Sequence, residues 1–282
     1  MGKIKIGIVG TGGVTRKSYL PYLSTVADVE IGLYGRNTEK TQACSKELKI
    51  VVFDSLAKLM AWGPDSVMLL TKETDRLAAA NEVLSFTPKR IFFEKPLTAA
   101  KGQANVSEED FFNGAALLKK AQTINCQTAM IFNYRFFEHS LLAKQIIQER
   151  GFGKVLNVTA LVHFACWSHC IDLIHAFAGT VTEISAFSGT SVREAAGMKA
   201  TDVCVAFRTS DDAVGTILGS NALTWDLPLF EMTFNFERGR IRFQDLDGDM
   251  EVSDCTLSAK FGRRQESYGI SKDKSRWDPY LA

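Results

Sequence analysis

The chain has 282 residues, of which 46% are hydrophobic and 23% are charged, and its 33 Lys and Arg residues against 32 Asp and Glu residues give a formal net charge of +1. This composition excludes an intrinsically disordered chain, and the lack of a basic excess argues against a nucleic-acid partner. The length allows one large or two medium domains, each of which can bury a hydrophobic core.

The sequence contains no apolar run of the ~18 residues that a membrane-spanning helix needs. The apolar stretch near the N-terminus is too short for a signal peptide, and the six cysteines lack the spacing of a disulfide framework. We therefore expect a cytoplasmic protein with reduced thiols and no membrane partner.

Residues 3–9 have the pattern of a buried strand, a glycine turn follows at Gly10–Gly13, and residues 14–26 have a helical pattern. In the dinucleotide-binding fingerprint, the first glycine permits the tight turn and the second lets the backbone approach the pyrophosphate. Thr15 stands at the position of the third glycine, so the match is partial. A plain glycine turn between a strand and a helix is the alternative interpretation.

The segments after this turn alternate between strand and helix patterns. Strands are predicted at 29–34, 50–53, 66–70 and 90–93, and helices at 38–48 and 75–85. Such alternation predicts a parallel, doubly wound sheet.

The residues after the second predicted strand indicate which cofactor is bound. NAD-binding proteins usually place an acidic residue here to hold the ribose 2′-hydroxyl, but this chain has Gly35-Arg36-Asn37, with Lys40 close by. A guanidinium matches the geometry of a phosphate, so NADP is favoured and NAD remains possible. The alternative is that Arg36 is a solvated turn residue.

Three motifs together resemble a known family. The motifs are Ile8–Gly13, Phe93-Glu94-Lys95-Pro96-Leu97 and Asn133-Tyr-Arg-Phe136, and in this order they resemble the Gfo/Idh/MocA oxidoreductases. The resemblance implies a Rossmann domain followed by an α/β domain with a large open sheet. It also implies NAD(P)-dependent transfer of hydride to or from a hydroxyl or ketone of a sugar or cyclic polyol.

Lys95 follows the fifth strand, at the carboxyl edge where parallel sheets bind ligands. There an ammonium group can stabilise a developing alkoxide, and the resemblance implies that Lys95 is the active-site lysine. Arg135 is expected either to contact the cofactor or substrate or to form a salt bridge at the domain junction. The expected cofactor-binding residues are Gly10, Thr11, Gly12, Gly13, Val14, Arg36, Asn37, Thr71, Glu94, Lys95 and Arg135.

After about residue 135 the pattern changes, so we expect a nucleotide-binding domain over 1–133 and an α+β substrate domain over 134–282. Helices are predicted at 140–150 and 170–177, and strands at 154–164, 181–188, 202–209, 214–222, 230–236, 240–244 and 250–257. Short turns between these strands predict a mainly antiparallel sheet. A wide sheet with an exposed outer face suggests a homodimer or homotetramer. Residues 262–269 and 271–277 are polar and basic, which predicts a solvated loop.

Three of the four histidines lie between His163 and His175. His169 is the expected proton-transfer group, and Asp172, three residues further on, is expected to orient it. The resemblance supports this assignment, because His169-Cys-Ile-Asp172-Leu resembles the family's His-x-x-Asp-Leu segment. The alternatives are a metal site formed with nearby cysteines, whose spacing matches no standard zinc pattern, and a purely structural helix.

The sequence also departs from the family pattern. Many members carry an aspartate four residues before the histidine, where this chain has Ala165, and the glycine-rich loop before it is missing. A second hypothesis for function is therefore an inactive NAD(P)- or sugar-binding sensor on the same fold.

Overall fold

The computed structural model describes residues 2–45, 48, 50–195, 198–221, 230–245, 249–256 and 264–269. The chain forms two compact units, an N-terminal unit that ends at Ile131 and a C-terminal unit that begins at Phe132. Among the described residues, no helix combines the length and the apolar character required to cross a bilayer.

The N-terminal unit is built on a six-stranded sheet in which all strand pairs are parallel. In spatial order the strands are β3 (Val51–Val52), β2 (Val29–Tyr34), β1 (Ile4–Val9), β4 (Ser66–Leu69), β5 (Arg90–Phe93) and β6 (Gln127–Met130). Strands β2 and β3 are added on one side of β1, and β4, β5 and β6 on the other, so the strand order reverses at β1. Open α/β sheets bind their ligands at such a switch point.

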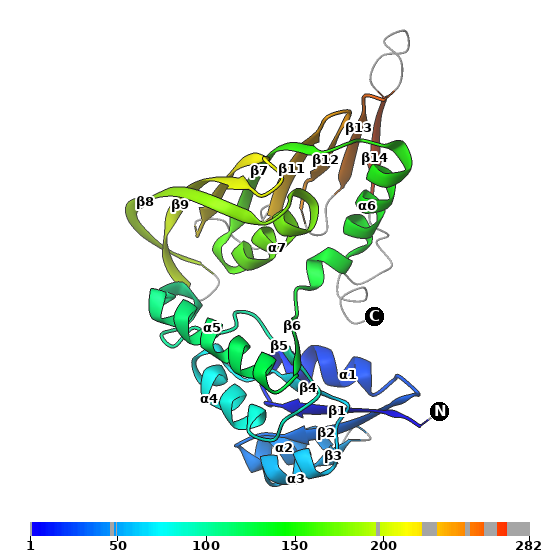
Figure 1. Ribbon diagram of the computed structural model, residues 1–282, viewed down its shortest axis with the longest axis vertical. Helices are drawn as coiled ribbons and strands as arrows, with labels where there is room; N and C mark the ends of the chain where they lie inside the picture. Colours follow the sequence, from blue (N-terminus) through cyan, green and yellow to red (C-terminus); the bar gives the residue numbers. More distant parts are fainter. Residues whose placement is uncertain are drawn as a thin grey trace. The chain divides into compact units, whose positions relative to one another are not determined.

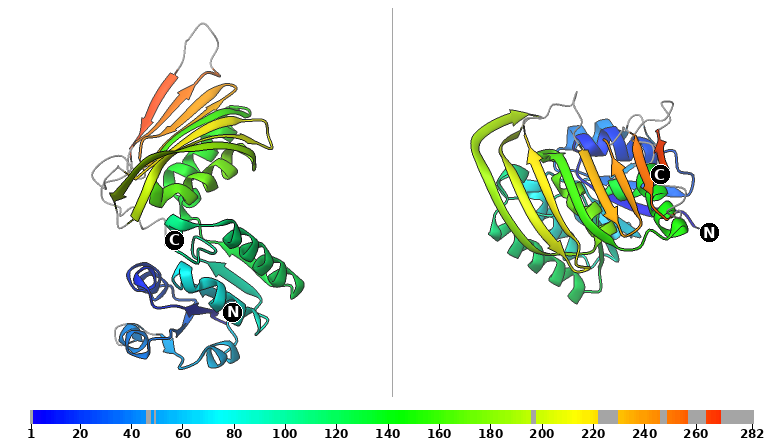
Figure 2. Two further views of the ribbon diagram at one scale, coloured as in Figure 1. Left: turned by 90° about the vertical axis from the view of Figure 1, so that its left-hand side faces the viewer. Right: turned by 90° about the horizontal axis from the view of Figure 1, so that it is seen from above.

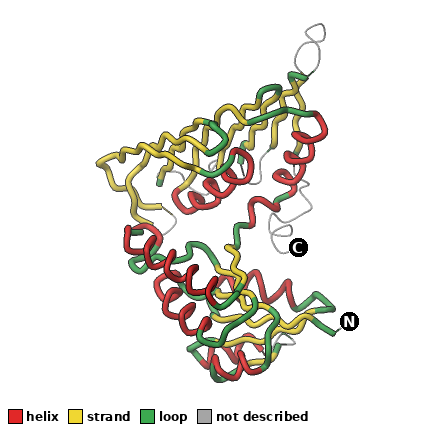
Figure 3. Tube along the Cα trace, in the orientation of Figure 1, coloured by secondary structure: helices red, strands yellow, loops and turns green. Residues whose placement is uncertain are grey.

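Helices cover both faces of this sheet, with α4 and α5 on one face and α1 on the other (Figures 1 and 3). The described helices are η1 (Thr15–Tyr19, a π-helix), α1 (Leu20–Leu23), α2 (Thr38–Ser45), α3 (Leu56–Ala61), α4 (Glu73–Leu84), η2 (Gln103–Asn105) and α5 (Glu108–Thr123). Inward side chains of the strands, among them Leu33, Val67 and Phe93, are almost completely buried between the layers.

Helices α3 and α5 were not predicted, although the sequence carries the start signal of each. Ser55 caps α3, with its side chain accepting a hydrogen bond from the Lys58 amide. Ser107 and Asp110 form a reciprocal capping box at the start of α5. The predicted helix over 14–26 is shorter, because it begins as the π-helix and ends at Leu23.

The C-terminal unit contains an eight-stranded sheet that is antiparallel except for the β7–β10 pair. In spatial order the strands are β14 (Arg264–Tyr268), β13 (Met250–Asp254), β12 (Gly239–Phe243), β11 (Phe230–Phe236), β7 (Val155–His163), β10 (Val214–Ser220), β9 (Met198–Thr209) and β8 (Val181–Ala195). The fold predicted from the sequence, a parallel Rossmann sheet and a large, mainly antiparallel sheet, is confirmed.

One face of this sheet packs against helices, and no helix of the described residues lies on the opposite face (Figure 2). The helical segments of the unit are η3 (Asn133–Phe136), α6 (Glu138–Arg150), η4 (Phe164–Cys166) and α7 (Trp167–Ala178). Strand β11 shows the division, because Phe230, Met232 and Phe234 are buried in the core while Glu231 and Thr233 are partly exposed.

Two predictions for the sheet require correction. Strands β8 and β9 are longer than predicted, because residues near Val192 and Thr201 continue the hairpin beyond the core. Residues 264–268, predicted as a loop, form β14, whereas 271–277 and the predicted strand ends at 222 and 257 lie outside the described residues.

Strand β14 is polar, and an arginine on a helix holds it in place. Arg150, in the last turn of α6, forms ion pairs with Asp254 (3.4 Å) and Glu266 (2.8 Å) and donates a hydrogen bond to the Tyr268 hydroxyl (3.3 Å). Hydrogen bonding from Arg150 lowers the pKa of Glu266 below its ordinary value of 4.5. The strand is therefore held by these charged contacts, by pairing with β13 and by the packing of Tyr268 against the core, and its polar composition alone led to the wrong prediction.

This arrangement predicts how stability depends on pH. Because the folded pKa of Glu266 is depressed, the unfolded chain takes up a proton first as the pH falls below 4.5, and the free energy of unfolding decreases. Arg150→Met should make this decrease shallower between pH ~5 and ~3 and lower the stability at neutral pH by about 1–2 kcal/mol. Urea denaturation across this range measures both effects.

Arg240→Met is the matched control, because Arg240 lies on β12 and hydrogen-bonds the Asn235 amide rather than a carboxylate. Identical pH profiles for wild type and Arg150→Met would contradict the role given to the Arg150–Glu266 pair.

Candidate functional site

The glycine turn after β1 leaves room for a ligand to approach the backbone. Gly10 has a φ of 115°, and a Cβ there would lie 2.8 Å from the backbone at Leu70 and Thr71. A Cβ on Gly12 would meet its nearest atom, the Leu70 oxygen, at 3.9 Å, and one on Gly13 would meet nothing within 4 Å. Of the three glycines in this turn, only Gly10 lacks room for a side chain, and the space beside Gly12 and Gly13 is open.

Other groups around the turn also fit a dinucleotide. The side-chain oxygens of Thr15 and Thr71 are buried and have no hydrogen-bond partner within the described part of the chain. The N–H groups at the start of a helix lack intrahelical partners and suit a phosphate. Val14 is exposed, whereas Thr11 packs against Gly35 at the end of β2. A bound dinucleotide would offer hydrogen-bond partners to these hydroxyls.

The residues expected to determine the specificity for NADP or NAD lie after β2. Arg36 is exposed and forms an ion pair with Asp75, in the first turn of α4. Asn37 accepts a hydrogen bond from the Lys40 amide (2.8 Å) and so closes the turn into α2. The Asn37 oxygen is therefore used by the protein itself, while Arg36 can reach a ligand if it leaves Asp75.

A buried arginine connects the two turns that follow β4 and β5. The Arg76 guanidinium donates hydrogen bonds to the backbone oxygens of Thr71 and Pro96, and the residue is only 2% exposed. Burial lowers the pKa of Arg76, and the nearby carboxylate of Glu94 opposes this effect. Arg76 thereby fixes the turn that carries Lys95, whose peptide bond to Pro96 is cis.

Glu94, next to Lys95, is held inside the same edge of the sheet. The Tyr19 hydroxyl donates a hydrogen bond to Glu94 Oε2 (3.3 Å). Burial raises the pKa of Glu94 above its ordinary value, although the positive charges of Lys95 and Arg76 act in the opposite direction. The arrangement places two cations and one carboxylate at the carboxyl edge of β5.

Sequence reasoning missed Arg76 and Tyr19. A signal for Arg76 was present, because Arg76, Ala80, Val83 and Leu84 all lie on the buried face of α4, at the spacing of an apolar helical stripe. A charged residue in such a stripe indicates a specific buried partner. No comparable signal marks Tyr19, since its contact with Glu94 joins residues 75 positions apart.

In the C-terminal unit, His169 is stacked on an aromatic ring. The rings of Tyr134 and His169 are 3.9 Å apart and inclined by 15°, and Phe132 meets the imidazole edge-on at 5.9 Å. His169 and Tyr134 are both largely buried, at 6% and 7% exposure. Stacking of this kind restricts the plane in which the imidazole lies.

Asp172, expected to orient His169, is bound by Arg135. Its two carboxylate oxygens accept hydrogen bonds from Arg135 Nε (2.8 Å) and from Arg135 Nη2. Asp172 raises the pKa of Arg135, so the guanidinium remains charged. Of the two interpretations of Arg135, the observed contact is a salt bridge, and both partners belong to the C-terminal unit.

The other two histidines in this region accept hydrogen bonds from backbone amides. His163 Nδ1 accepts from the Ala165 amide (3.1 Å), and burial lowers the pKa of His163. His175 Nε2 accepts from the Val181 amide (3.4 Å). Within the described ranges, no three His, Cys, Asp or Glu side chains are placed to hold a metal ion, Cys166 and Cys170 included.

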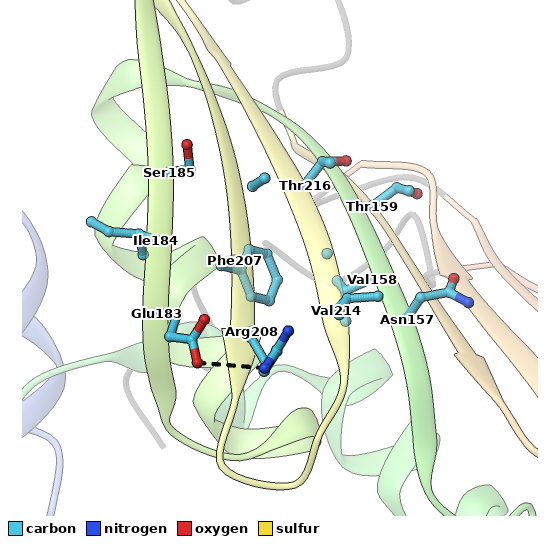
Figure 4. Close-up of a pocket in the computed structure, with 12 residues that line it drawn as sticks. Asn157, Val158, Thr159, Glu183, Ile184, Ser185, Phe207, Arg208, Val214 and Thr216 are labelled. Atoms are coloured by element: carbon cyan, nitrogen blue, oxygen red, sulfur yellow. Dashed lines mark hydrogen bonds and ion pairs between the residues drawn. The ribbon is translucent and has the colours of Figure 1, made fainter.

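A hollow of about 680 Å³ lies in the C-terminal unit away from all these residues (Figure 4). Residues of β7, β8, β9 and β10 line it, and Glu183 and Arg208 form an ion pair across two of the strands (3.5 Å). It contains none of the predicted site residues.

The role of Arg76 can be tested by stability. Arg76→Met should lower the free energy of unfolding by about 2–4 kcal/mol, because two partly buried backbone oxygens lose their charged donor. Thermal or urea denaturation measures the loss. Arg90→Met is the control, because Arg90 makes an exposed hydrogen bond to Gln127 on the same sheet (3.0 Å). Equal, small losses for both variants would contradict the bridging role of Arg76.

Comparisons with known proteins also indicate a dinucleotide-binding fold in the N-terminal unit. Residues 4–123 match the family model GFO_IDH_MocA, described as an oxidoreductase family with an NAD-binding Rossmann fold. Glucose-6-phosphate 3-dehydrogenase of Bacillus subtilis (strain 168) is 24% identical over 161 residues, which cover 57% of this chain and 42% of that protein. The match thus spans less than half of the relative's length.

Solved structures resemble both units. The WlbA dehydrogenase from Bordetella pertussis, solved with NADH and UDP-GlcNAcA, has a TM-score of 0.71 and 21% identity, covering 88% of this chain and 76% of its own. UDP-N-acetylglucosamine 3-dehydrogenase GnnA from Acidithiobacillus ferrooxidans has a TM-score of 0.75 and 18% identity, covering 100% and 86%. At these identities the likeness establishes the fold. Residues 4–123, fewer than half of the chain, are thus similar to the Gfo/Idh/MocA oxidoreductases, whose family model describes an NAD-binding Rossmann fold.

Proposed function

We propose that this protein is an NAD(P)-dependent oxidoreductase, with NADP preferred, that transfers hydride to or from a secondary hydroxyl or ketone of a sugar or cyclic polyol. The observation that carries the proposal is the position of Lys95. It follows β5 at the carboxyl edge of a parallel sheet, in a turn that the buried Arg76 holds in place. Such a fixed cation at the ligand-binding edge is suited to act on a substrate oxygen.

Lys95 stabilises the alkoxide that develops as the substrate hydroxyl loses its proton. The Glu94 carboxylate interacts electrostatically with both Lys95 and Arg76, and the hydrogen bond from Arg76 to the Pro96 oxygen keeps the Lys95 turn in place. The nicotinamide of a bound dinucleotide supplies the chemistry of accepting or donating the hydride.

His169 exchanges the hydroxyl proton, since an imidazole titrates near neutral pH. Its stacking on Tyr134 sets the orientation of the ring, so the imidazole does not depend on a carboxylate for alignment. The Arg135–Asp172 pair joins η3 to α7 and so keeps Tyr134 and His169 in register. Asp172 is thus proposed to support His169 indirectly, through the segment that carries Tyr134.

The preference for NADP rests on Arg36, with Lys40 four residues further on. No acidic residue follows β2 in the stretch Gly35-Arg36-Asn37, where an NAD-binding protein would hold the 2′-hydroxyl. A guanidinium there favours a 2′-phosphate.

The similar proteins suggest the class of sugar. Two are dehydrogenases named for oxidation at position 3 of glucose 6-phosphate or UDP-N-acetylglucosamine, and a third was solved with NADH and UDP-GlcNAcA. We therefore propose a phosphorylated or nucleotide-linked sugar as the substrate. Six free cysteines suit a reducing, cytoplasmic compartment.

The second candidate is a sensor that binds NAD(P) or a sugar without turning it over. Ala165 favours it, because this position, in η4, carries no carboxylate that could relay a proton. Nicotinamide absorbance followed against sugars, polyols, sugar phosphates and UDP-sugars separates the two. Reduction or oxidation with any of them supports the enzyme, and saturable binding without turnover across the panel supports the sensor.

Lys95→Ala should reduce turnover at least ~100-fold, because the substrate alkoxide loses its cation, while the dinucleotide still binds. Steady-state kinetics and fluorescence titration measure the two quantities. Lys101→Ala, which removes an exposed lysine further along the same connection, is the matched control. Turnover unchanged by Lys95→Ala would remove Lys95 from the mechanism.

The uncovered face of the C-terminal sheet is proposed to pack against a second copy, giving a homodimer or homotetramer. By strand register, the exposed Phe187 and Leu218 share this face with Cys204 and Leu161. Its charges pair internally, as Arg242 does with Glu231 (2.9 Å), so two like faces would not repel strongly.

Phe187→Glu should therefore shift the protein towards monomer, because it places a carboxylate within an apolar contact. Light scattering during size-exclusion chromatography measures the mass. Phe111→Glu is the control, because Phe111 is equally exposed but lies on α5 of the N-terminal unit. A monomeric wild-type protein would contradict the proposed interface.

A further inference from the structure

The ion pair between Arg36 and Asp75 joins the two strands that flank β1. Arg36 follows β2, and Asp75 lies in the first turn of α4, which follows β4. Since β1 lies between β2 and β4, the pair connects the strand ends on either side of the glycine turn. It therefore belongs to the edge where a dinucleotide is expected to lie.

Asp75 and a 2′-phosphate would compete for the same guanidinium. The residue after the second strand of a Rossmann fold faces the 2′ position of the adenosine ribose, so Arg36 is the group that would bind a phosphate there. In the structure, the Arg36 guanidinium is already engaged in an ion pair with the Asp75 carboxylate. Arg36 must release Asp75 to bind the phosphate fully, and the remaining carboxylate then repels the phosphate.

A 2′-hydroxyl places no such demand on the pair. Because the hydroxyl is uncharged, the charges of Arg36 and Asp75 have little effect on its binding. The two cofactors thus differ in how much they depend on Asp75.

We propose that Asp75 is a specificity-determining residue, which lowers the affinity for NADP by competing for Arg36 and leaves the affinity for NAD almost unchanged. The inference rests on the proposed function, in that it requires a dinucleotide to bind at the glycine turn. It makes the preference for NADP weaker than Arg36 alone would give.

The expected effect is moderate, because the side chains of Arg36 and Asp75 are 76% and 43% exposed. Exposed ion pairs are weak and screened by salt, so removing the carboxylate should tighten NADP binding by about threefold to tenfold. The change should become smaller as the salt concentration rises.

Helix α4 offers a matched control on the same turn. Glu73 carries the same charge in the first turn of α4, where acidic residues also favour the helix dipole. Glu73→Gln therefore reproduces any effect on the helix or on the overall field, whereas the ion pair of Arg36 is made with Asp75. Asp75→Asn keeps the shape of the side chain and removes only the charge.

The experiment is calorimetric titration of the full chain with NADP and with NAD, for wild type, Asp75→Asn, Glu73→Gln, Arg36→Met and the Arg36→Met/Asp75→Asn double variant. Asp75→Asn should bind NADP about threefold to tenfold more tightly, with NAD affinity changed by less than about twofold. Glu73→Gln should change the ratio of the two affinities less. In the Arg36→Met background, Asp75→Asn should change this ratio much less, because only the salt-screened repulsion between the Asp75 carboxylate and the phosphate is then removed.

Circular dichroism confirms that each variant is folded. An unchanged ratio in Asp75→Asn, an equal gain for both cofactors, or weaker NADP binding would overturn the inference, and the last result would make Asp75 a residue that positions Arg36 for the phosphate. In each of these cases dinucleotides still bind, so the proposed function survives. If wild type binds neither cofactor, the proposed function fails and this inference with it.

Discussion

The contact on which the N-terminal site depends is the buried guanidinium of Arg76 bridging the backbone oxygens of Thr71 and Pro96. A parallel sheet ends in separate loops, and nothing in the strand ladder fixes one loop against the next. Arg76 supplies that connection between the loops after β4 and β5, and a buried cation with two backbone acceptors is costly to displace. The position of Lys95 therefore depends on a helix residue whose bonding partner, Pro96, lies twenty positions further along the chain.

In the C-terminal unit, aromatic packing and an ion pair hold a candidate site residue in place. His169 is on α7, yet its ring is held by Tyr134 from η3, and the Arg135–Asp172 pair joins the same two segments. Stacking fixes the plane of the imidazole, while the ion pair fixes the distance between the segments. These contacts bear on the orientation of the imidazole, whereas the carboxylate that is absent at Ala165 would bear on the relay of a proton.

The sequence predicts the fold well because the fold depends on short-range patterns. Apolar strands, glycine turns and capping residues act within a few positions of one another, and the strand–helix alternation leads directly to the parallel sheet. The contacts of the site join residues far apart in sequence. Arg135 meets Asp172 and Tyr19 meets Glu94, and no local pattern pairs them. Strand β14 shows the same limit, because its stability comes from Arg150 on a distant helix.

The first turn of α4 carries two neighbouring charged residues that make contacts in different directions. Asp75 reaches outward to Arg36, and Arg76, the next residue, reaches inward to the turn that carries Lys95. Neighbouring residues on a helix point about 100° apart, so one turn can serve both the outer and the inner part of the site. A shift of this turn would move both side chains together. The dense packing of Gly10 against Leu70 and Thr71 opposes such a shift, because it fixes the loop from which α4 begins. The single glycine that packing requires in the nucleotide turn thus also secures the helix that carries both charged contacts.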